Sequence, residues 1–377
     1  MIFLLIKEID LTSRDDVKKF VEFPFCLYRD SNFWVPPLLD GVLESLNPAI
    51  HPFYKHSSAA FFIAENDMSG EVMGRLAVMN NRNYNYFNKS KTALFAYFEC
   101  QDKQQVSDEL FSAGIEWARN QGLTEIIGPR GLAPADGGGI LIEGFNEKPI
   151  MGIPYNYHYY DQLIRNFGFE KNTDYLSGYF NRNDTLDVRY RRVAYKLAER
   201  RGFKTKEFSS YKELSFWLNR ILDAHHLAFS ENHTYFPPTD EEVKYLLKTL
   251  NKVVDHKLIK LVLKDDQIAG FLFCLPDLSN ALKRSRGKLL PWGWYYLLRE
   301  KKQTKQVNVN LIAVMPRYRG LGVLAILYAS LADTFFRCGY DRLELVTVEE
   351  NNSKAINENN YLGAHWYKRH RDYKLAI

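Results

Sequence analysis

The segment from residue 307 to residue 338 constrains the fold of this chain more than any other. Val307, Val309 and Leu311 alternate with Asn308 and Asn310, a period of two that is typical of a strand with one apolar face. A loop with two glycines follows, and then an apolar stretch as long as a helix. This order predicts a domain in which a strand feeds a helix through a tight loop.

The loop between that strand and helix has the composition of an anion-binding turn. Gly320 and Gly322 allow the backbone to approach a ligand closely, and the amides that open the next helix point outward with the positive end of its dipole. Arg317 and Arg319 can add charge-assisted contacts, so the loop suits a pyrophosphate. The alternative is a tight turn with arginines for solubility. The patterns of a Rossmann loop and of a Walker loop are not met.

Composition places the chain among ordinary globular proteins. Its 377 residues suggest about two domains, with 46% apolar and 25% charged residues. A net charge of +5 without a long Lys/Arg run argues against a specific nucleic-acid partner. Four separated cysteines give no metal or disulfide pattern, and the apolar run at residues 1–6 is too short for a signal or a membrane span. We therefore expect a soluble, cytoplasmic protein without a bound metal.

The order of expected elements is similar in two halves of the chain, which indicates two diverged copies of one α/β unit. The polar stretch from 181 to 187 lacks periodicity, so we place the boundary there, with domains at 1–182 and 183–377. The first 60 residues or so are expected to be irregular. In the first half we expect strands at 60–64, 72–78, 93–100 and 124–127 and helices at about 106–118 and 159–167; in the second, strands at 203–208, 258–263, 268–275, 307–314, 342–348 and 365–375 and helices at 214–228, 240–250, 322–338 and 353–362.

The second half resembles the GNAT N-acetyltransferase family in three motifs. Arg317-x-x-Gly320-x-Gly322 is similar to the coenzyme A loop of that family, and Asn352-Ser-Lys-Ala355 to its Asn-x-x-Ala helix start. Leu362-Gly363 is similar to the Leu-Gly that ends the same helix. The resemblance covers about half of the chain. Over its full length the chain also resembles a group of bacterial tandem GNAT-like proteins, through stretches such as 27–37 and 154–160.

The resemblance implies a fold and a cofactor. The fold is two tandem GNAT-like domains of the α+β or α/β class, each with a mixed, mostly antiparallel sheet flanked by helices. The implied activity is transfer of an acetyl or other acyl group from acetyl-CoA or another acyl-CoA to an amine of a small molecule or peptide. The implied contacts are the backbone of Ile312, Ala313 and Val314 for the pantetheine arm, the amides of Arg317, Tyr318, Arg319, Gly320, Leu321, Gly322 and Val323 for the pyrophosphate, and Asn352.

Catalysis requires a base for the amine and an acid for the leaving thiolate. The candidates for the base are Glu349, Glu231 and His233, each of which could equally be a solvated surface residue. In many members of the family a Tyr four residues after the Ala of Asn-x-x-Ala protonates the thiolate, but here that position is Asn359. Tyr361 is a further candidate acid, with packing as the alternative role.

Two other segments bear on function. Where the strand ending at Cys100 should lead into glycines, the chain has Gln101-Asp-Lys-Gln-Gln105, so we expect no coenzyme in the first half. The aromatic insertion at 281–304, followed by a basic stretch, is expected to pack between the domains, with gating of an apolar acceptor or contact with a membrane surface as alternatives.

Two alternative functions remain open. A pair of GNAT-like halves also resembles the FemX-type aminoacyl transferases, which use aminoacyl-tRNA and would need a positive channel between the halves. Asn359 is compatible with a third class, a regulatory module that binds acyl-CoA without turnover.

Overall fold

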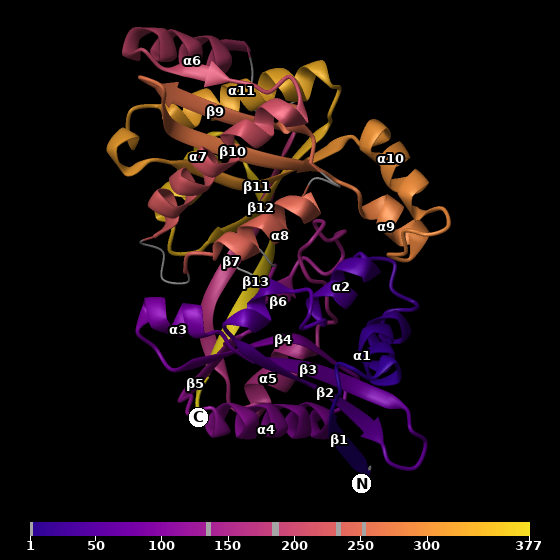
Figure 1. The fold of residues 1–377 in the computed structure, drawn as a ribbon. Helices are drawn as coiled ribbons and strands as arrows, with labels where there is room; N and C mark the ends of the chain where they lie inside the picture. The colour runs from indigo at the N-terminus through magenta and orange to yellow at the C-terminus, as the bar shows by residue number, and fades with distance from the viewer. Residues whose placement is uncertain (1–2, 133–136, 183–187, 231–234, 251–253) are drawn as a thin grey trace.

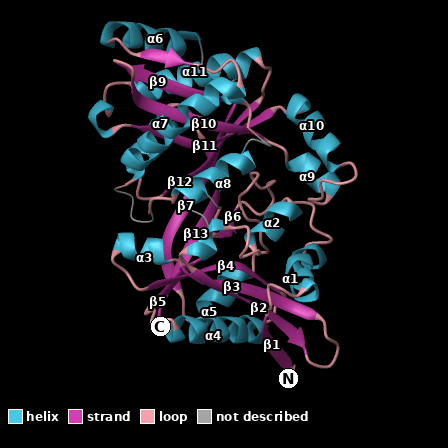
Figure 2. Cartoon of the chain, in the orientation of Figure 1, coloured by secondary structure: helices cyan, strands magenta, loops and turns pink. Residues whose placement is uncertain are grey.

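The computed structural model describes residues 3–132, 137–182, 188–230, 235–250 and 254–377 (Figure 1). Its strands form one continuous sheet, with helices over both halves (Figure 2). The first half contains β1 (Leu4–Glu8), α1 (Arg14–Leu27), α2 (Leu39–Ser45), the short 3-10 helix η1 (Pro52–Lys55), β2 (Ser58–Asn66), β3 (Val72–Asn80), α3 (Arg82–Asn88), β4 (Thr92–Cys100), α4 (Gln104–Asn120), β5 (Glu125–Gly128), β6 (Ile140–Glu143), α5 (Tyr160–Phe167) and β7 (Glu170–Asn181).

The second half repeats a similar order of strands and helices. No helix in the described part of the chain is both long and apolar enough to cross a membrane. The second half contains α6 (Val188–Arg201), β8 (Lys204–Lys206), α7 (Tyr211–Phe229), α8 (Asp240–Leu250), η2 (His256–Leu258), β9 (Ile259–Lys264), β10 (Gln267–Pro276), α9 (Ser279–Ser285), α10 (Gly293–Gln303), β11 (Gln306–Val314), η3 (Pro316–Tyr318), α11 (Val323–Arg337), β12 (Arg342–Glu349), α12 (Ser353–Tyr361) and β13 (His365–Ala376).

The sheet has the strand order β1-β2-β3-β4-β5-β13-β7-β12-β11-β10-β9-β8, and β6 pairs with β13. In this sheet, β4 with β5 and β11 with β12 are the parallel pairs, and the other pairs are antiparallel. Each parallel pair is joined by a helix, α4 or α11, because a parallel connection needs a crossover. The expected mixed, mostly antiparallel strand pairing is confirmed, but the two halves share one continuous sheet instead of having one each.

The two halves exchange strands at the centre of the sheet. β13, the last strand of the chain, pairs with β5 of the first half through Tyr373 and Gly128. β7, which precedes the expected boundary, pairs with β12 of the second half through Phe180 and Leu343. A cut at residue 182 would therefore divide the chain without separating two independent sheets. The boundary itself stays a prediction.

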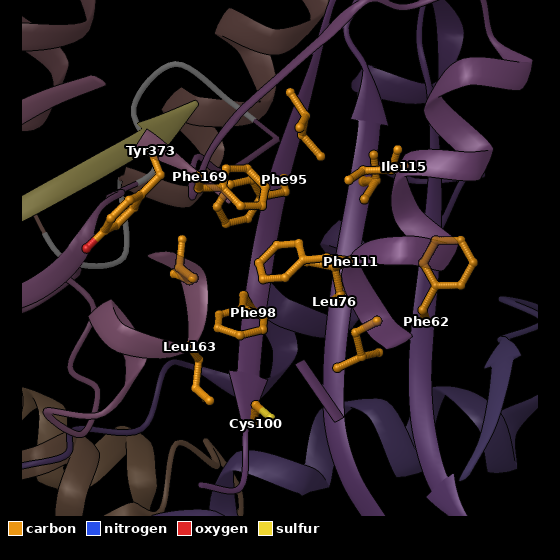
Figure 3. Close-up of a cluster of buried hydrophobic side chains, with 14 of the residues drawn as sticks. Phe62, Leu76, Phe95, Phe98, Cys100, Phe111, Ile115, Leu163, Phe169 and Tyr373 are labelled. Atoms are coloured by element: carbon orange, nitrogen blue, oxygen red, sulfur yellow. The ribbon is translucent and has the colours of Figure 1, made fainter. Parts of the chain in front are cut away.

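The many aromatic residues fill the cores on either side of the sheet. In the first half, Phe111 of α4 stacks on Phe98 of β4, with ring centroids 4.6 Å apart, and meets the edge of Phe95 at 5.4 Å. Tyr373 reaches this cluster from β13 and is fully buried (Figure 3). The end of the chain is thus part of the first core, which agrees with the strand exchange.

The expectation that the first 60 residues are irregular is wrong. They form β1, α1 and α2. Helix α1 begins with the Ser13 hydroxyl accepting from the Asp16 amide, and it continues through Pro24. A proline there removes the donor to the Phe20 carbonyl. The buried Arg75 guanidinium donates to that carbonyl instead, at 2.7 Å, which explains why the helix tolerates the proline.

The helices and strands α3, β6, β7, α6, α9 and α10 were also not expected from the sequence. β7 buries polar residues, among them Asp174, which binds Arg371 at 2.7 Å. α6 is rich in arginine, and its described buried residues are Ala194 and Ala198. Partners from distant parts of the chain make these polar segments regular, and such partners leave no periodic apolar pattern.

The insertion at 281–304 was expected to pack between the two halves, and only part of it does so. Gly287, just after α9, accepts a hydrogen bond from the Leu39 amide of the first half at 2.9 Å. The large apolar side chains of the α9–α10 connection and of α10 are instead exposed, Leu290 and Trp292 most of all.

A buried histidine makes the stability of the fold depend on pH. His370 of β13 is fully buried and donates from Nε2 to the Pro154 carbonyl at 3.1 Å. Burial lowers the pKa of His370 to about 4, from 6.5. Between these values the unfolded chain binds more protons than the folded chain, so stability falls as the pH drops from 6.5 to 4, by up to about 3 kcal/mol for this residue.

We expect His370→Gln to reduce this acid sensitivity. Urea unfolding at pH 6.5 and at pH 4.5 should show a smaller loss of stability in the variant than in the parent protein, whatever its stability at neutral pH. Equal losses in the two proteins would contradict the assignment. Burial also lowers the pKa of His225 to about 4. Part of the acid sensitivity should therefore remain in the variant as well as in the parent protein.

Candidate functional site

The parallel strands β11 and β12 separate halfway along their length. They pair from Gln306 opposite Arg342 to Val309 opposite Leu345, and then stop pairing. β11 continues to Val314 beside β10, and β12 continues to Glu349 beside β7. We call these diverging ends, residues 310–314 and 346–349, the β11–β12 fork. Within the described sheet, the facing edges of the fork have no strand between them.

A β-bulge marks the point where the fork opens. Phe273 lies opposite Leu311 and Cys274 opposite Val309, so Asn310 is the extra residue of β11. The bulge changes which side chains face α11: Val307 and Val309 pack in its core before the bulge, and Ile312 and Val314 lie against that core after it. Bulges are common beside active sites, where they redirect side chains.

Two buried side-chain atoms at this point, one from each of two asparagines, lack hydrogen-bond partners. Within the described structure, neither Asn310 Oδ1 nor Asn308 Nδ2 is bonded. Buried polar atoms are rarely left unpaired, so an unpaired pair beside the fork favours a ligand there. The sequence analysis recorded these residues only as the polar partners in an alternating strand. Two asparagines that alternate with apolar residues in one strand were the available signal.

The predicted cofactor loop joins β11 to α11 at the end of the fork. Tyr318 donates its amide to the Met315 carbonyl at 2.8 Å, and Leu321 donates to Tyr318 at 3.2 Å, which closes the turn. Gly320 and Gly322 have φ angles of +75° and +81°, which favour glycine. A side chain at Gly320 would point into open space, whereas one at Gly322 would meet the Leu197 methyl of α6 at 2.1 Å.

The N-terminus of α11 is suited to an anion. Gly322 is its N-cap, no side chain caps it, and its first turn has no acidic residue. The amides of the first turn, beginning at Val323, have no acceptor within the helix. They carry the positive end of the helix dipole. These amides therefore offer donors for a phosphate group, as the sequence predicts.

The two loop arginines lie on the surface and contact neighbouring elements. Arg317 is exposed, contacts Gln267 at the start of β10, and places its guanidinium 4.5 Å from the centre of the Tyr318 ring. Arg319 is also exposed and donates to the Ala228 carbonyl of α7 at 3.5 Å. Both guanidinium groups thus lie on the surface around the loop.

Glu349 and Asn352 lie on the other arm of the fork. Glu349 is half-buried at the end of β12, opposite Tyr175 of β7. Asn352 caps α12: its side chain accepts from the Ala355 amide at 3.1 Å, and its own amide donates to the Glu349 carbonyl at 2.9 Å. Asn352 therefore has a structural role, and its contact with a cofactor stays a prediction.

Three other residues are candidates for catalysis, and the structure describes one of them, Tyr361. Glu231 and His233 lie outside the described residues. Tyr361 ends α12 with 84% of its side chain exposed, so it is not the packed aromatic residue considered above. Asn359 is buried and accepts from the Tyr328 hydroxyl at 2.8 Å, while it donates to the Ala355 carbonyl at the same distance. Burial raises the pKa of Tyr328, which keeps its proton on that bond.

A buried polar cluster that the sequence analysis missed lies on the sheet face opposite α11. Glu344 of β12 pairs with Arg342 at 2.8 Å and accepts from the Tyr367 hydroxyl. Burial raises the pKa of Glu344, and it lowers the pKa of the neighbouring Lys368 to about 8. Asn308 lies opposite Glu344 in the parallel register, so the cluster reaches the start of the fork. A glutamate between two buried leucines in β12 was the available signal.

The first half has a similar fork, and its own side chains fill it. β4 and β5 pair only from Thr92 to Leu94, and β4 carries a bulge between Ala96 and Glu99. The Cys100 amide donates to the Tyr160 hydroxyl at 3.1 Å, and the Cys100 carbonyl accepts from Tyr159 at 2.8 Å. These bonds use the backbone groups that a pantetheine arm would need, which favours the second half as the cofactor site.

Comparisons with known proteins give matches to one region of the chain and to nearly its whole length. A model described as the acetyltransferase (GNAT) family matches residues 219–358. "Protein YghO" of Escherichia coli is 27% identical over 97% of this chain and 94% of its own length. "Bacterial ceramide synthase" of Caulobacter vibrioides is 26% identical over 96% of this chain and 95% of its own length.

Two solved structures share the fold over the full length. A tandem GNAT protein from the clavulanic acid biosynthesis pathway has a TM-score of 0.59 at 12% identity, with 99% of this chain and 98% of that chain covered. A GCN5-related N-acetyltransferase from Sphaerobacter thermophilus has a TM-score of 0.52 at 13% identity, with 99% and 95% covered. The second half thus contains a domain that matches the GNAT family model, and the whole chain has the fold of these two structures.

Proposed function

We propose that this chain transfers an acyl group from an acyl-CoA to an amine, at the β11–β12 fork. The observation that carries the proposal is that the two strands separate beside the N-terminus of α11, which no side chain caps. Proteins of the GNAT family generally use acyl-CoA. The pyrophosphate would bind the amides of residues 317–323, and the pantetheine arm would lie along Ile312, Ala313 and Val314.

In this proposal Glu349 is the general base. The amine nitrogen forms a bond to the thioester carbonyl carbon, Glu349 takes the proton of the amine, and the bond from carbon to sulfur breaks. A thiol has a pKa near 8.5, so its thiolate is a good leaving group that can take a proton from water. The proposed reaction therefore does not require a tyrosine at position 359. Near-attack geometry and a positioned base would supply most of the rate.

For the acceptor we propose a long-chain amino alcohol. The support is the likeness, over nearly the full length of both chains, to the relative named "Bacterial ceramide synthase". A ceramide is the amide of a fatty acid with a long-chain amino alcohol, so its synthesis from acyl-CoA is N-acyl transfer. A small polar amine or a peptide is the alternative acceptor.

Release of free thiol from acyl-CoA tests this function. We expect release to depend on the amine, and to be faster with a long-chain amino alcohol than with serinol, which has the same head group without the chain. Glu349→Gln should lower kcat by about 10²- to 10⁴-fold and leave CoA affinity unchanged. Glu350→Gln is the matched control. It changes the adjacent carboxylate, which pairs with Lys171 at 2.7 Å, and it should leave kcat nearly unchanged.

Two results would contradict the proposal. CoA binding without thiol release for any amine would indicate the regulatory module. Transfer from aminoacyl-tRNA, with no use of acyl-CoA, would indicate the FemX-like function.

A further inference from the structure

A group of large apolar side chains projects from the second half at the connection between α9 and α10. Leu290 and Trp292 are 78% and 64% exposed, and three large apolar residues of α10 are also exposed. Figure 1 shows α9 and α10 on one flank of the molecule, beside the sheet rather than over it. We call these residues the aromatic tip: Leu290, Trp292, Trp294, Tyr295 and Leu298.

The aromatic tip is held in a defined conformation. A side chain on the buried Gly293 would lie 1.8 Å from the Lys288 carbonyl, so the turn needs glycine to close. Within the turn, the Trp294 amide donates to the Leu289 carbonyl at 3.0 Å, and the Trp294 indole donates to the Pro291 carbonyl at 2.9 Å. These contacts present the apolar side chains to solvent in a tight, bonded turn.

Both ends of this element are fixed to the body of the protein. At the end of α9, the Gly287 carbonyl accepts from the Leu39 amide at 2.9 Å. In α10, Glu300 is buried and accepts from Asn280 at 2.8 Å, and Lys301 donates to the Val254 carbonyl at 2.5 Å. The protein thus holds an apolar surface away from its own core, which is unusual for a monomer without a partner there.

The surroundings of the tip are strongly basic. Residues 278–305 contain eight Lys or Arg and one acidic residue, Glu300, for a net charge of +7. The whole chain has +5, so all its other residues together carry −2. Glu300 is buried, while Lys288, Arg299 and Lys302 are exposed. The excess positive charge of the protein is therefore concentrated around the tip.

We propose that the aromatic tip docks on the surface of an anionic lipid bilayer. Trp and Tyr favour the level of the lipid head groups, and the leucines would enter the acyl boundary below them. The basic residues around the tip match the negative charge of anionic lipids. A protein partner would have to supply both an apolar pocket and an acidic rim, whereas a bilayer supplies both along any stretch of its surface. This proposal rests on the exposed apolar and basic residues of the tip and does not depend on acyl transfer at the fork.

Flotation of the full chain with lipid vesicles tests this docking. We expect binding to vesicles that contain phosphatidylglycerol, at least tenfold weaker binding to pure phosphatidylcholine, and weakening by salt. The double variant Trp292→Ser, Trp294→Ser should bind at least tenfold more weakly. The matched control is Tyr86→Ser, Phe216→Ser, which removes two rings from α3 and α7 that are more exposed than the tryptophans, and it should bind as the parent does.

The double variant Lys288→Gln, Arg299→Gln tests the role of the basic residues around the tip. It should lose most of the preference for anionic vesicles. Equal binding of the parent and the tryptophan double variant would overturn the proposal, as would absence of binding to the anionic vesicles. A third result would also overturn the proposal. If the protein does not bind vesicles but self-associates, and the tryptophan double variant abolishes that self-association, the tip is a contact between copies of the chain.

Discussion

Gly320→Val is expected to weaken acyl-CoA binding by about 10- to 100-fold. Gly320 has a φ of +75°, and its added side chain would point into the open space over the loop. In the proposed complex the pyrophosphate occupies that space. The variant would lose one or two hydrogen bonds from backbone amides to a charged group, each about 1.5–3 kcal/mol. Calorimetric titration with CoA measures the change.

Gly70→Val is the matched control for this variant. Gly70 has a φ of +67° and also faces open space, in the turn between β2 and β3. Both substitutions impose the same kind of backbone strain, so their effects on stability should be similar, at about 1 kcal/mol. Only Gly320→Val should affect CoA binding. Equal CoA affinity in both variants would show that the loop does not hold the pyrophosphate.

Arg130→Ala is expected to lower the free energy of unfolding by about 3–5 kcal/mol, because it breaks a buried ion pair. This is the largest loss of stability that we expect from one substitution. Arg130 follows β5, and its guanidinium binds the fully buried Asp372 of β13 at 2.7 Å. Tyr175 of β7 donates to the same carboxylate at 3.2 Å. The variant would leave a buried carboxylate without its cation where the two halves exchange strands. Urea unfolding at pH 7 measures the loss.

Lys55→Ala is the comparison for this pair. Lys55 binds Glu241 at 2.5 Å, but both side chains are more than half exposed. Its loss should cost less than about 1 kcal/mol, because water screens an exposed pair. If Arg130→Ala costs no more than Lys55→Ala, the Arg130–Asp372 pair does not hold the exchanged strands together.

The sequence allowed close prediction of the elements that carry their own local pattern. The strands expected at 307–314 and 342–348 occur at 306–314 and 342–349, and the helix expected at 322–338 occurs at 323–337. Alternation sets the period of a half-buried strand, and glycines mark where the chain must turn, so these signals are local. Gly322 ends the loop and begins α11, as the motif predicts.

The parts that escaped prediction depend on contacts between distant residues. β7 was not predicted from the sequence, and its buried Asp174 and Ser177 find partners in other strands, Arg371 of β13 and the Val346 carbonyl of β12. The insertion of β13 beside β5 has no local signal either, since a strand carries no mark of which edge it will join. Strand exchange therefore had to come from the structure.

The candidate site divides in the same way. The loop from Arg317 to Gly322 could be found because backbone conformation restricts its residue types. The bulge at Asn310 could not, because a bulge is defined by the register of the neighbouring strand. The general acid also has no local signal, because position 359 holds an asparagine that bonds Tyr328.

A crystal structure with coenzyme A bound is the most direct test of the central claim, that the β11–β12 fork is the acyl-CoA site. The account predicts the pyrophosphate on the amides at the start of α11, and the pantetheine arm between β11 and β12 alongside Ile312 to Val314. The sulfur should lie near Asn310 and within reach of Glu349. Coenzyme A bound at β4 and α4 of the first half, or elsewhere than the fork, would contradict the account.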